Sequence, residues 1–462
     1  ELVLVILVLI LLVLELAIKE EKKKAIIPIS IILFLITTMI GFLPVETTTL
    51  FGGSYSTGPL SAMMKNVLNI GVFIVFLQSA FWLKKDENEG KISEFYILIL
   101  STLIGMNFMI SSGDFLMFYL GLELATIPIA SLAAYEKYKN KSAEAGIKLI
   151  LSSALSSGIL LFGLSIVYGT TGSIYFSEVA ANFGTQPLQV LGFIFFVSGM
   201  GFKISLVPFH LWTADVYEGS PINVTSYLSV VSKAAAVFIF MIILFTVFKT
   251  ITHMWENLLY TLSVITMTIG NLFALRQKNL KRFLAFSSIA QAGFLLMGIM
   301  GASSMGMTSV IYFALIYIFS NLAAFGVVSA VYDQSGKERM DDYNGLYSTN
   351  PKLSLVMMLA LFSLAGIPPV AGYFGKFFLF ASAASKGYYW LVLIAVLNAT
   401  VSLYYYLLVV KAMFINKSDE PIAAFKSPFT TRVALIICVL GLFLIGFMSL
   451  IYENILSVSF GI

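Results

Sequence analysis

Apolar stretches long enough to cross a lipid bilayer recur along nearly the whole chain. A transmembrane helix needs about 20 apolar residues to span roughly 30 Å of hydrocarbon. The 462-residue sequence contains fourteen such stretches, near residues 2–18, 25–43, 62–83, 94–110, 114–134, 143–169, 188–208, 221–247, 257–275, 281–300, 305–331, 351–385, 388–414 and 430–452. Only 11% of the residues are charged, against roughly 25% in soluble domains. The sequence therefore predicts an all-α polytopic membrane protein with fourteen transmembrane helices and no soluble domain.

The positions of Lys and Arg support this count and orient the chain. Loops after odd-numbered helices hold 21 of the 28 basic residues, whereas loops after even-numbered helices hold only Lys65, Lys249 and Lys386. Cytoplasmic loops collect Lys and Arg, and one missed helix would move every later loop to the other side. The pattern thus predicts both termini outside. The loop after the seventh helix is an exception, because it carries Asp215 and Glu218 and no basic residue.

Proline interrupts two of the predicted helices, the seventh at Pro208 and the twelfth at Pro368 and Pro369. Discontinuous helices at matching places in two halves indicate a duplicated transporter core. We interpret residues 1–93 as helices 1–3, 94–247 as a first repeat (helices 4–8), 248–414 as a second, inverted repeat (helices 9–13) and 415–462 as the last helix. The alternative for each proline site is a kink that serves only helix packing.

Four titratable side chains lie deep inside apolar segments: Glu123, Lys203, Lys233 and Lys376. Charged groups at such depth are costly, so they indicate function by default. A lone carboxylate there tends to take up a proton and a lone lysine to lose one, whereas a Glu–Lys pair keeps both charged. The set predicts a proton relay in which Glu123 controls Lys203. The alternative is a static ion pair that fixes packing, which would leave Lys233 without a purpose.

Polar side chains of the tenth and eleventh helices are the expected bridge between Lys233 and Lys376: Ser287, Ser288, Gln291, Tyr312, Tyr317, Ser320 and Asn321. Hydroxyls and amides can hold a water chain without titrating near neutral pH, although such groups also serve as interhelical hydrogen bonds. Lys148 follows Glu144 by four residues near the start of the sixth helix. A relay role and snorkelling of Lys148 to the interface are both open.

Redox and nucleic-acid chemistry are not expected in this chain. The single cysteine, Cys438, excludes internal disulfides and Cys-ligated clusters or zinc sites. The two histidines, His210 and His253, are too few for haem ligation by neighbouring pairs. The net charge of +4 comes from short loops between membrane segments, so it does not indicate nucleic-acid binding. Tyrosines 404–406 are expected to pack or to lie at the interface rather than to bind a quinone.

Several segments resemble a known family. Residues 201–221, GFKISLVPFHLWTADVYEGSP, resemble the signature of the antiporter-like subunits of respiratory complex I and of the Mrp cation antiporters. Supporting stretches are residues 232–234, 279–293 and 366–377, and the resemblance covers roughly residues 90–410. Within the family, the length, the absence of a lateral-helix extension and a lysine at position 376 are most similar to the subunit N branch.

The resemblance implies a proton-pumping subunit of NADH:quinone oxidoreductase in the bacterial inner membrane, with both termini periplasmic. It implies no redox centre in this chain; FMN, iron–sulfur clusters and quinone are expected in partner subunits. The expected neighbours are homologous antiporter-like subunits, small membrane subunits and lipids. The alternatives are an Mrp-type cation/proton antiporter subunit and a purely structural membrane subunit.

The same resemblance assigns expected roles to individual residues. Glu123 would be the modulator in helix five, Lys203 its partner in helix seven, Lys233 the central lysine of helix eight and Lys376 the exit-side lysine of helix twelve. His210 of the signature is a further candidate. Two positions depart from the family: Ala214 replaces a usual proline, and Gln291 stands where a histidine is common. A glutamine cannot carry a proton by its own titration, so the central step would depend on water and hydroxyls.

Overall fold

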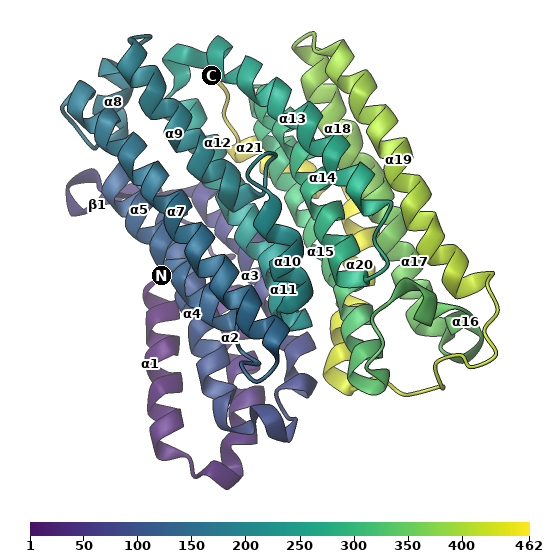
Figure 1. Ribbon diagram of the computed structural model, residues 1–462. Coiled ribbons are helices and arrows are strands. Elements are labelled where there is room, and N and C mark those ends of the chain that lie inside the picture. Colours follow the sequence, from purple (N-terminus) through teal and green to yellow (C-terminus); the bar gives the residue numbers. More distant parts are fainter.

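The computed structural model describes residues 1–462, apart from the side chains of Glu20, Glu21 and Glu89. The chain folds into a bundle of long, roughly parallel helices (Figure 1). The first half contains α1 (Leu2–Ala17), α2 (Ile26–Ile40), α3 (Pro59–Trp82), α4 (Ile92–Ile110), α5 (Phe115–Leu124), α6 (Ile127–Ala133), α7 (Asn140–Thr171), α8 (Phe176–Asn182), α9 (Pro187–Ile204), α10 (Leu211–Gly219), α11 (Ile222–Tyr227) and α12 (Lys233–Thr246).

The second half continues the bundle without a soluble domain among the described residues. It contains α13 (Thr252–Ala274), α14 (Leu280–Met300), α15 (Ser304–Ser335), α16 (Leu346–Thr349), α17 (Pro351–Ala365), α18 (Gly372–Ser385), α19 (Tyr389–Phe414), α20 (Phe429–Phe447) and α21 (Ser449–Val458). A short antiparallel hairpin, β1 (Thr48–Leu50) and β2 (Tyr55–Thr57), lies between α2 and α3. The hairpin was not predicted, because its strands have only three residues each.

Twelve helices in the described part of the chain are long and apolar enough to cross a membrane. This confirms a multi-pass membrane protein. The other two predicted spans fall on shorter apolar helices, the first on α1 and the twelfth on α17 with α18. The count of fourteen and the inverted repeat therefore stay predictions.

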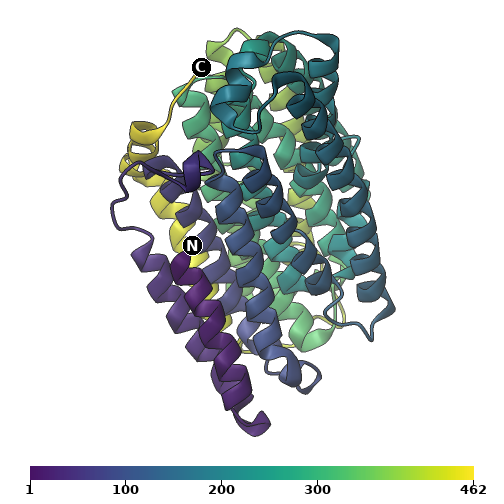
Figure 2. The ribbon, with the colours of Figure 1, turned by 90° about the vertical axis from the view of Figure 1, so that its left-hand side faces the viewer.

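The core of the bundle consists of α14 and α15 with α11 and α12 beside them. The most apolar 18-residue windows of α14 and α15 are completely buried, and that of Ile222–Thr246 is 94% buried, whereas those of α7 and α19 are only 33% buried. The outer helices expose large apolar side chains on one face, as expected of surfaces that meet lipid. Segments distant in sequence close the bundle: α20 packs against α3 (Figure 2).

The structure places the predicted helix breaks beside unusual backbone. Helix α9 ends at Ile204, and Ser205 is left-handed with φ of 69°. The freed N–H of Val207 donates to Thr266 Oγ1 at 3.1 Å. Helix α17 ends at Ala365, and Gly366 has φ of 88°, a conformation that glycine adopts without a Cβ clash.

Two further irregularities were not predicted. Helix α5 ends at Leu124 and α6 begins at Ile127, so the fifth predicted helix is also interrupted. Residues Leu228–Ser232 form a single π-helical turn between α11 and α12, directly before Lys233. Such π-turns inside α-helices occur frequently at functional sites.

Most basic residues gather at one end of the bundle, which is the lower end in Figure 1 and is called the basic end below. Several basic residues assigned to loops lie in the end turns of helices, such as Lys281 in α14, and one at the opposite end was placed wrongly. Lys65 lies inside α3 and is buried, with its Nζ 2.6 Å from Glu1 Oε1 and 2.5 Å from Ser111 Oγ. It is therefore a helix residue that neutralises an acid, and the opposite end is poorer in exposed lysines than the sequence pattern indicated.

Candidate functional site

Lys203 occupies the last turn of α9, at the first helix break, and its side chain is half-buried. Its Nζ donates to Thr126 Oγ1 at 2.7 Å and to the carbonyl oxygen of Ala125 at 3.4 Å. Both acceptors lie where α5 gives way to α6, so the interruption of one helix supplies oxygens to the lysine of another. The Lys203 ammonium is thus held mainly by neutral oxygens.

Glu123 precedes these acceptors by two residues, near the end of α5. It interacts electrostatically with Lys203, but no ion pair within 4.0 Å joins them among the described side chains. The structure thus brings the predicted partners into one neighbourhood without direct contact. Thr126 is an acceptor for Lys203 that the sequence did not single out.

Lys233 begins α12, after the π-turn, and only 3% of it is exposed. Its Nζ donates to Ser288 Oγ at 2.9 Å and to the Ser288 carbonyl at 3.2 Å. Within the part of the chain that the structure describes, no carboxylate forms an ion pair with it. A buried ammonium without a counter-charge is costly, so this position is unusual for a residue that serves packing alone.

Lys376 lies in the first turns of α18, just past the second helix break, and is 4% exposed. Its Nζ donates to the Ala365 carbonyl at 3.0 Å and sits 4.7 Å from the centre of the Phe294 ring. The Ala365 carbonyl is at the end of α17 and lacks a continuing helix. As at Lys203, the amine donates a hydrogen bond to a carbonyl oxygen at a helix break.

Side chains of α14 lie next to the acceptors of both Lys233 and Lys376. Next to Ser288, the hydroxyl of Ser287 bonds to the hydroxyl of Tyr406 on α19. Gln291 Nε2 donates to Tyr406 Oη at 3.2 Å and to the Leu364 carbonyl at 3.1 Å, one residue before the acceptor of Lys376. Gln291 Oε1 is buried without a hydrogen-bond partner among the described residues.

The remaining predicted bridge residues divide into two groups. Asn321 Nδ2 donates to Tyr317 Oη at 2.8 Å and to Ser229 Oγ at 3.0 Å, which places both residues at the π-turn that precedes Lys233. The Ser320 hydroxyl bonds to Ser363 near the second break. Tyr312 instead donates to the Ile445 carbonyl on α20, so the structure does not bring it into this group.

A face of buried polar groups without partners follows the first helix break toward the basic end. Its members are spaced by three to five residues, and the structure gives them no hydrogen-bond partner within its described part: Ser205 Oγ, His210 Nδ1, Thr213 Oγ1, Tyr217 Oη and Ser220 Oγ. Buried polar groups are normally satisfied by protein or ordered water. The predicted candidate His210 belongs to this face, which sequence reasoning did not recognise.

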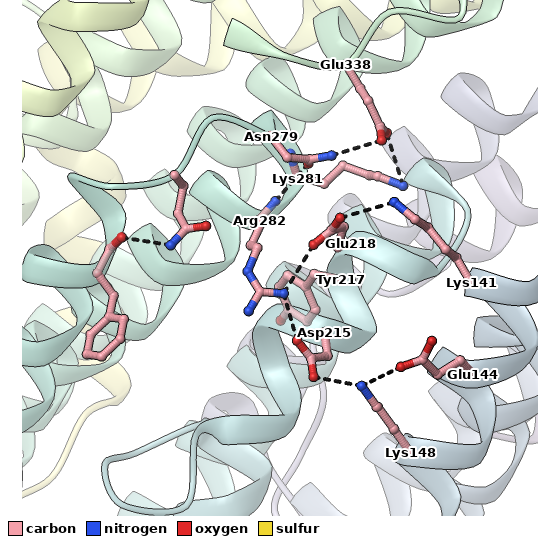
Figure 3. A network of polar contacts seen from close by, with 12 residues as sticks. Lys141, Glu144, Lys148, Asp215, Tyr217, Glu218, Asn279, Lys281, Arg282 and Glu338 are labelled. Carbon is pink, nitrogen blue, oxygen red and sulfur yellow. Dashed lines mark hydrogen bonds and ion pairs between the residues drawn. The ribbon is translucent and has the colours of Figure 1, made fainter.

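Lys148 lies apart from the buried lysines, in a network of ion pairs at the basic end (Figure 3). Its Nζ is 2.6 Å from Glu144 and 2.8 Å from Asp215 of α10, and its side chain is 42% exposed. Arg282 Nη1 contacts Asp215 at 2.7 Å and Glu218 at 3.1 Å. Partial burial alone would raise the pKa of Asp215, but hydrogen bonds from Lys148 and Arg282 outweigh it and hold this pKa below its ordinary value.

The network joins the two predicted repeats, because α7 and α10 belong to the first and α14 to the second. Asn279 caps α14 through its side chain and donates to Glu338, which also pairs with Lys281 at 3.4 Å (Figure 3). Lys281 donates to the Ser220 carbonyl. A pocket of about 220 Å³ opens here and includes Ser220, Lys281 and Glu338 in its lining.

Two functional candidates were missed. Tyr406 lies in a run of three tyrosines, of which Tyr404 is 59% exposed and Tyr406 fully buried; only helix rotation tells them apart. Glu256 is a buried acid at the start of α13 whose Oε2 accepts from Tyr388 at 2.9 Å. The predicted ninth span begins at residue 257, whereas α13 begins at Thr252, so the sequence placed Glu256 just outside the membrane segment. In the described part of the chain, no group of three His, Cys, Asp or Glu side chains could hold a metal ion.

Comparison with known proteins identifies the family. A family model described as NADH:quinone oxidoreductase/Mrp antiporter, TM, matches residues 112–402. The chain belongs to this family. NADH-quinone oxidoreductase subunit N of Phocaeicola vulgatus is 53% identical over 427 residues, covering 92% of this chain and 90% of that relative. Its counterpart from Moorella thermoacetica is 42% identical over 398 residues, covering 85% and 83%.

Solved structures of the NADH:quinone oxidoreductase/Mrp antiporter family share the fold. A chain of respiratory complex I from Thermus thermophilus with bound aureothin matches with a TM-score of 0.79 and 28% identity over 96% of both chains. A chain of the Mrp complex from Dietzia sp. DQ12-45-1b matches with a TM-score of 0.85 over 99% of this chain and 96% of its own, at 20% identity, which shows the fold alone. The matched residues 112–402 include Glu123, Lys148, Lys203, His210, Lys233 and Lys376, but not Tyr406.

Proposed function

We propose that this chain is a proton-translocating membrane subunit of an NADH:quinone oxidoreductase. The names of its relatives support this assignment. The chain would lie in the bacterial inner membrane with both termini periplasmic, as fourteen spans in which helices 4–8 and 9–13 are inverted repeats. Flavin, iron–sulfur clusters and quinone would belong to partner subunits, and the neighbours would be homologous antiporter-like subunits, small membrane subunits and lipid.

The observation that carries the proposal is the bonding of the buried amines. Lys233 and Lys376 donate only to neutral oxygens in the described structure. A structural ion pair would need a carboxylate to offset the cost of burial. Amines held by a hydroxyl or a carbonyl can bind and release a proton without breaking a salt bridge, which suits a relay.

Protons would enter from the basic end along the face from Ser220 to Ser205. Each of its unpartnered polar atoms can bind water, and Ser220 lines the 220 Å³ pocket at the bundle end. Glu123 would control Lys203: when the acid is charged the amine stays protonated, and when it is neutralised the proton moves on.

From Lys233 the proton would pass through Ser288, Ser287 and Tyr406 toward Lys376. The hydroxyls exchange protons by accepting one hydrogen bond and donating another. Gln291 would not titrate but would hold Tyr406 in place and bind water through its free Oε1. Electron transfer elsewhere in the complex would drive the cycle.

An Mrp-type cation/proton antiporter subunit is the second candidate, favoured by the fold match to the Dietzia Mrp chain. The two functions differ in partners and in ion. A complex I subunit purifies with flavin and iron–sulfur proteins, and its pumping depends on NADH oxidation. An antiporter subunit exchanges cations without NADH.

The test is Lys233→Ala in the assembled enzyme, reconstituted in liposomes. We expect assembly and NADH oxidation by the peripheral subunits to persist while protons pumped per NADH fall severalfold. Lys249→Ala removes an exposed lysine that forms no ion pair in the described structure, and we expect it to pump normally. Unchanged pumping in Lys233→Ala would instead support a purely structural role.

A further inference from the structure

A lateral groove opens between α17 and α20 at the basic end. Apolar side chains form its walls, Leu353 and Val356 from α17 and Leu435, Ile436, Val439 and Leu440 from α20. Its volume is about 640 Å³, within the range of roughly 300–1,000 Å³ typical of sites for small organic ligands. Ile436 and Leu440 are more than half exposed, so the walls can receive a hydrocarbon chain from the side.

Three cations lie at one mouth of this groove: Lys352, Lys426 and Arg432. All three are exposed, and their charged groups form no hydrogen bond or ion pair within the described structure. Some other cations at the same end are paired, such as Lys85 with Asp333 at 2.7 Å and Lys139 with Glu136 at 2.9 Å. The groove lining includes no acid, so its mouth carries an uncompensated positive charge.

The segment that carries Lys426 is fixed against α17. Asn350 is buried, its Nδ2 donates to the Ala423 carbonyl at 3.1 Å, and its Oδ1 accepts from the Phe425 N–H at 3.1 Å. The cations from α17, from this segment and from α20 therefore meet at a preformed site. Helices α17 and α20 both begin there, and helix N-termini add positive potential.

We propose that this groove binds one anionic phospholipid. Its phosphate lies among Lys352, Lys426 and Arg432, and an acyl chain runs along α17 and α20. Basic pockets between transmembrane helices bind anionic lipid headgroups. A zwitterionic lipid has no net charge to neutralise the three cations, free phosphate would leave the apolar walls uncovered, and an apolar partner helix would leave the cations unpaired. The proposal does not depend on the proton relay.

The experiment uses the purified complex in detergent and phosphatidylglycerol with a photoreactive group in one acyl chain. After illumination, labelled peptides are mapped by mass spectrometry. We expect labelling in residues 351–356 and 435–440, with competition by unlabelled phosphatidylglycerol but not by phosphatidylcholine. The triple variant K352Q/K426Q/R432Q should weaken binding about 100-fold, since each cation near a membrane surface contributes roughly a factor of 5.

Two controls separate the occupants. The variant K84Q/R276Q/K278Q removes the same charge from exposed positions outside the groove and should label like the wild type. Val439→Trp fills the groove without changing its charge and should also abolish labelling. Equal competition by phosphatidylcholine, full competition by inorganic phosphate alone, or absence of labelling in the complex because a partner helix covers the groove would each overturn the proposal.

Discussion

Replacement of Tyr406 by Phe tests the link between the central and exit-side lysines. The change removes one oxygen, which bonds to Ser287 and accepts from Gln291. Interhelical hydrogen bonds in membrane proteins contribute about 0.6 kcal/mol each, so two lost bonds should cost only about 1 kcal/mol of stability. The complex should therefore assemble.

The effect on proton transfer should be much larger than the effect on stability. Without the hydroxyl, the hydrogen-bonded chain from Ser287 toward Lys376 has a gap that a phenyl ring fills. A positioned proton-transfer group contributes typically 10²–10⁴-fold to a rate, so we expect pumping at saturating NADH to fall at least about 10-fold. The assay combines NADH oxidation with dye quenching in proteoliposomes, and native gel electrophoresis reports assembly.

This test needs a matched control outside the proposed path. Tyr405 is unsuitable because its hydroxyl interacts with Tyr406 and Ser287, so Tyr312→Phe serves instead. Tyr312 is a buried tyrosine on α15 whose hydroxyl donates to the Ile445 carbonyl at 2.7 Å, outside the group that joins the lysines. The variant loses the same atom at similar stability cost. Normal pumping by Tyr406→Phe, or an equal loss in Tyr312→Phe, would refute the proposed path.

Three further predictions address the break, the inlet and the basic end. Gly372→Ala places a Cβ 1.7 Å from the Ser363 carbonyl oxygen, so we expect native gels to show no assembled complex. The control Gly158→Ala, whose Cβ would have no atom within 4 Å, should assemble. An intact Gly372→Ala complex would contradict the packing at this break. Thr213→Val removes a buried hydroxyl that has no partner in the described structure, so the melting temperature should hold while pumping slows; unchanged pumping would exclude Thr213 from the inlet. Lys148 and Arg282 lower the pKa of Asp215, so its contribution to the free energy of unfolding is complete above pH 3.8, its ordinary pKa, and is lost as the pH falls below that. Asp215→Asn should therefore lower the free energy of unfolding at pH 7 by at most about 1 kcal/mol, because the ion pairs are partly exposed. In acid, thermal melting of the variant should converge with that of the wild type.

The sequence predicted three of the amines that lie within membrane segments, but not what they bind. An amine inside an apolar run is visible in the sequence itself, and so Lys203, Lys233 and Lys376 could be identified as candidate site residues. The direct partners Thr126, Ser288 and Ala365 could not, because they depend on helix rotation and on where a helix breaks. The interruption after Leu124 does have a sequence signal, Pro128, which was read only as part of a span.

Helix phase explains the other omissions. The π-turn at Leu228–Ser232 inserts a residue into the helical period and so changes which side of α12 faces α14, with no distinctive residue type to reveal it. In the same way, a run of three tyrosines does not state which of them points inward. Lys65 was counted with a loop because charge patterns locate residues near a membrane boundary but do not distinguish a loop from the first turns of a helix.

The helix irregularities and the buried amines depend on each other. A break leaves carbonyls without helical partners, and such groups are tolerated at membrane depth only when something donates to them. Lys203 and Lys376 donate to the carbonyls of Ala125 and Ala365 at two of these breaks. A lysine that loses its proton keeps fewer N–H groups to donate, so its hold on the break weakens. In the proposed relay, proton occupancy and the local geometry of the broken helices would therefore be coupled, and proton movement at one lysine would alter the packing around the next.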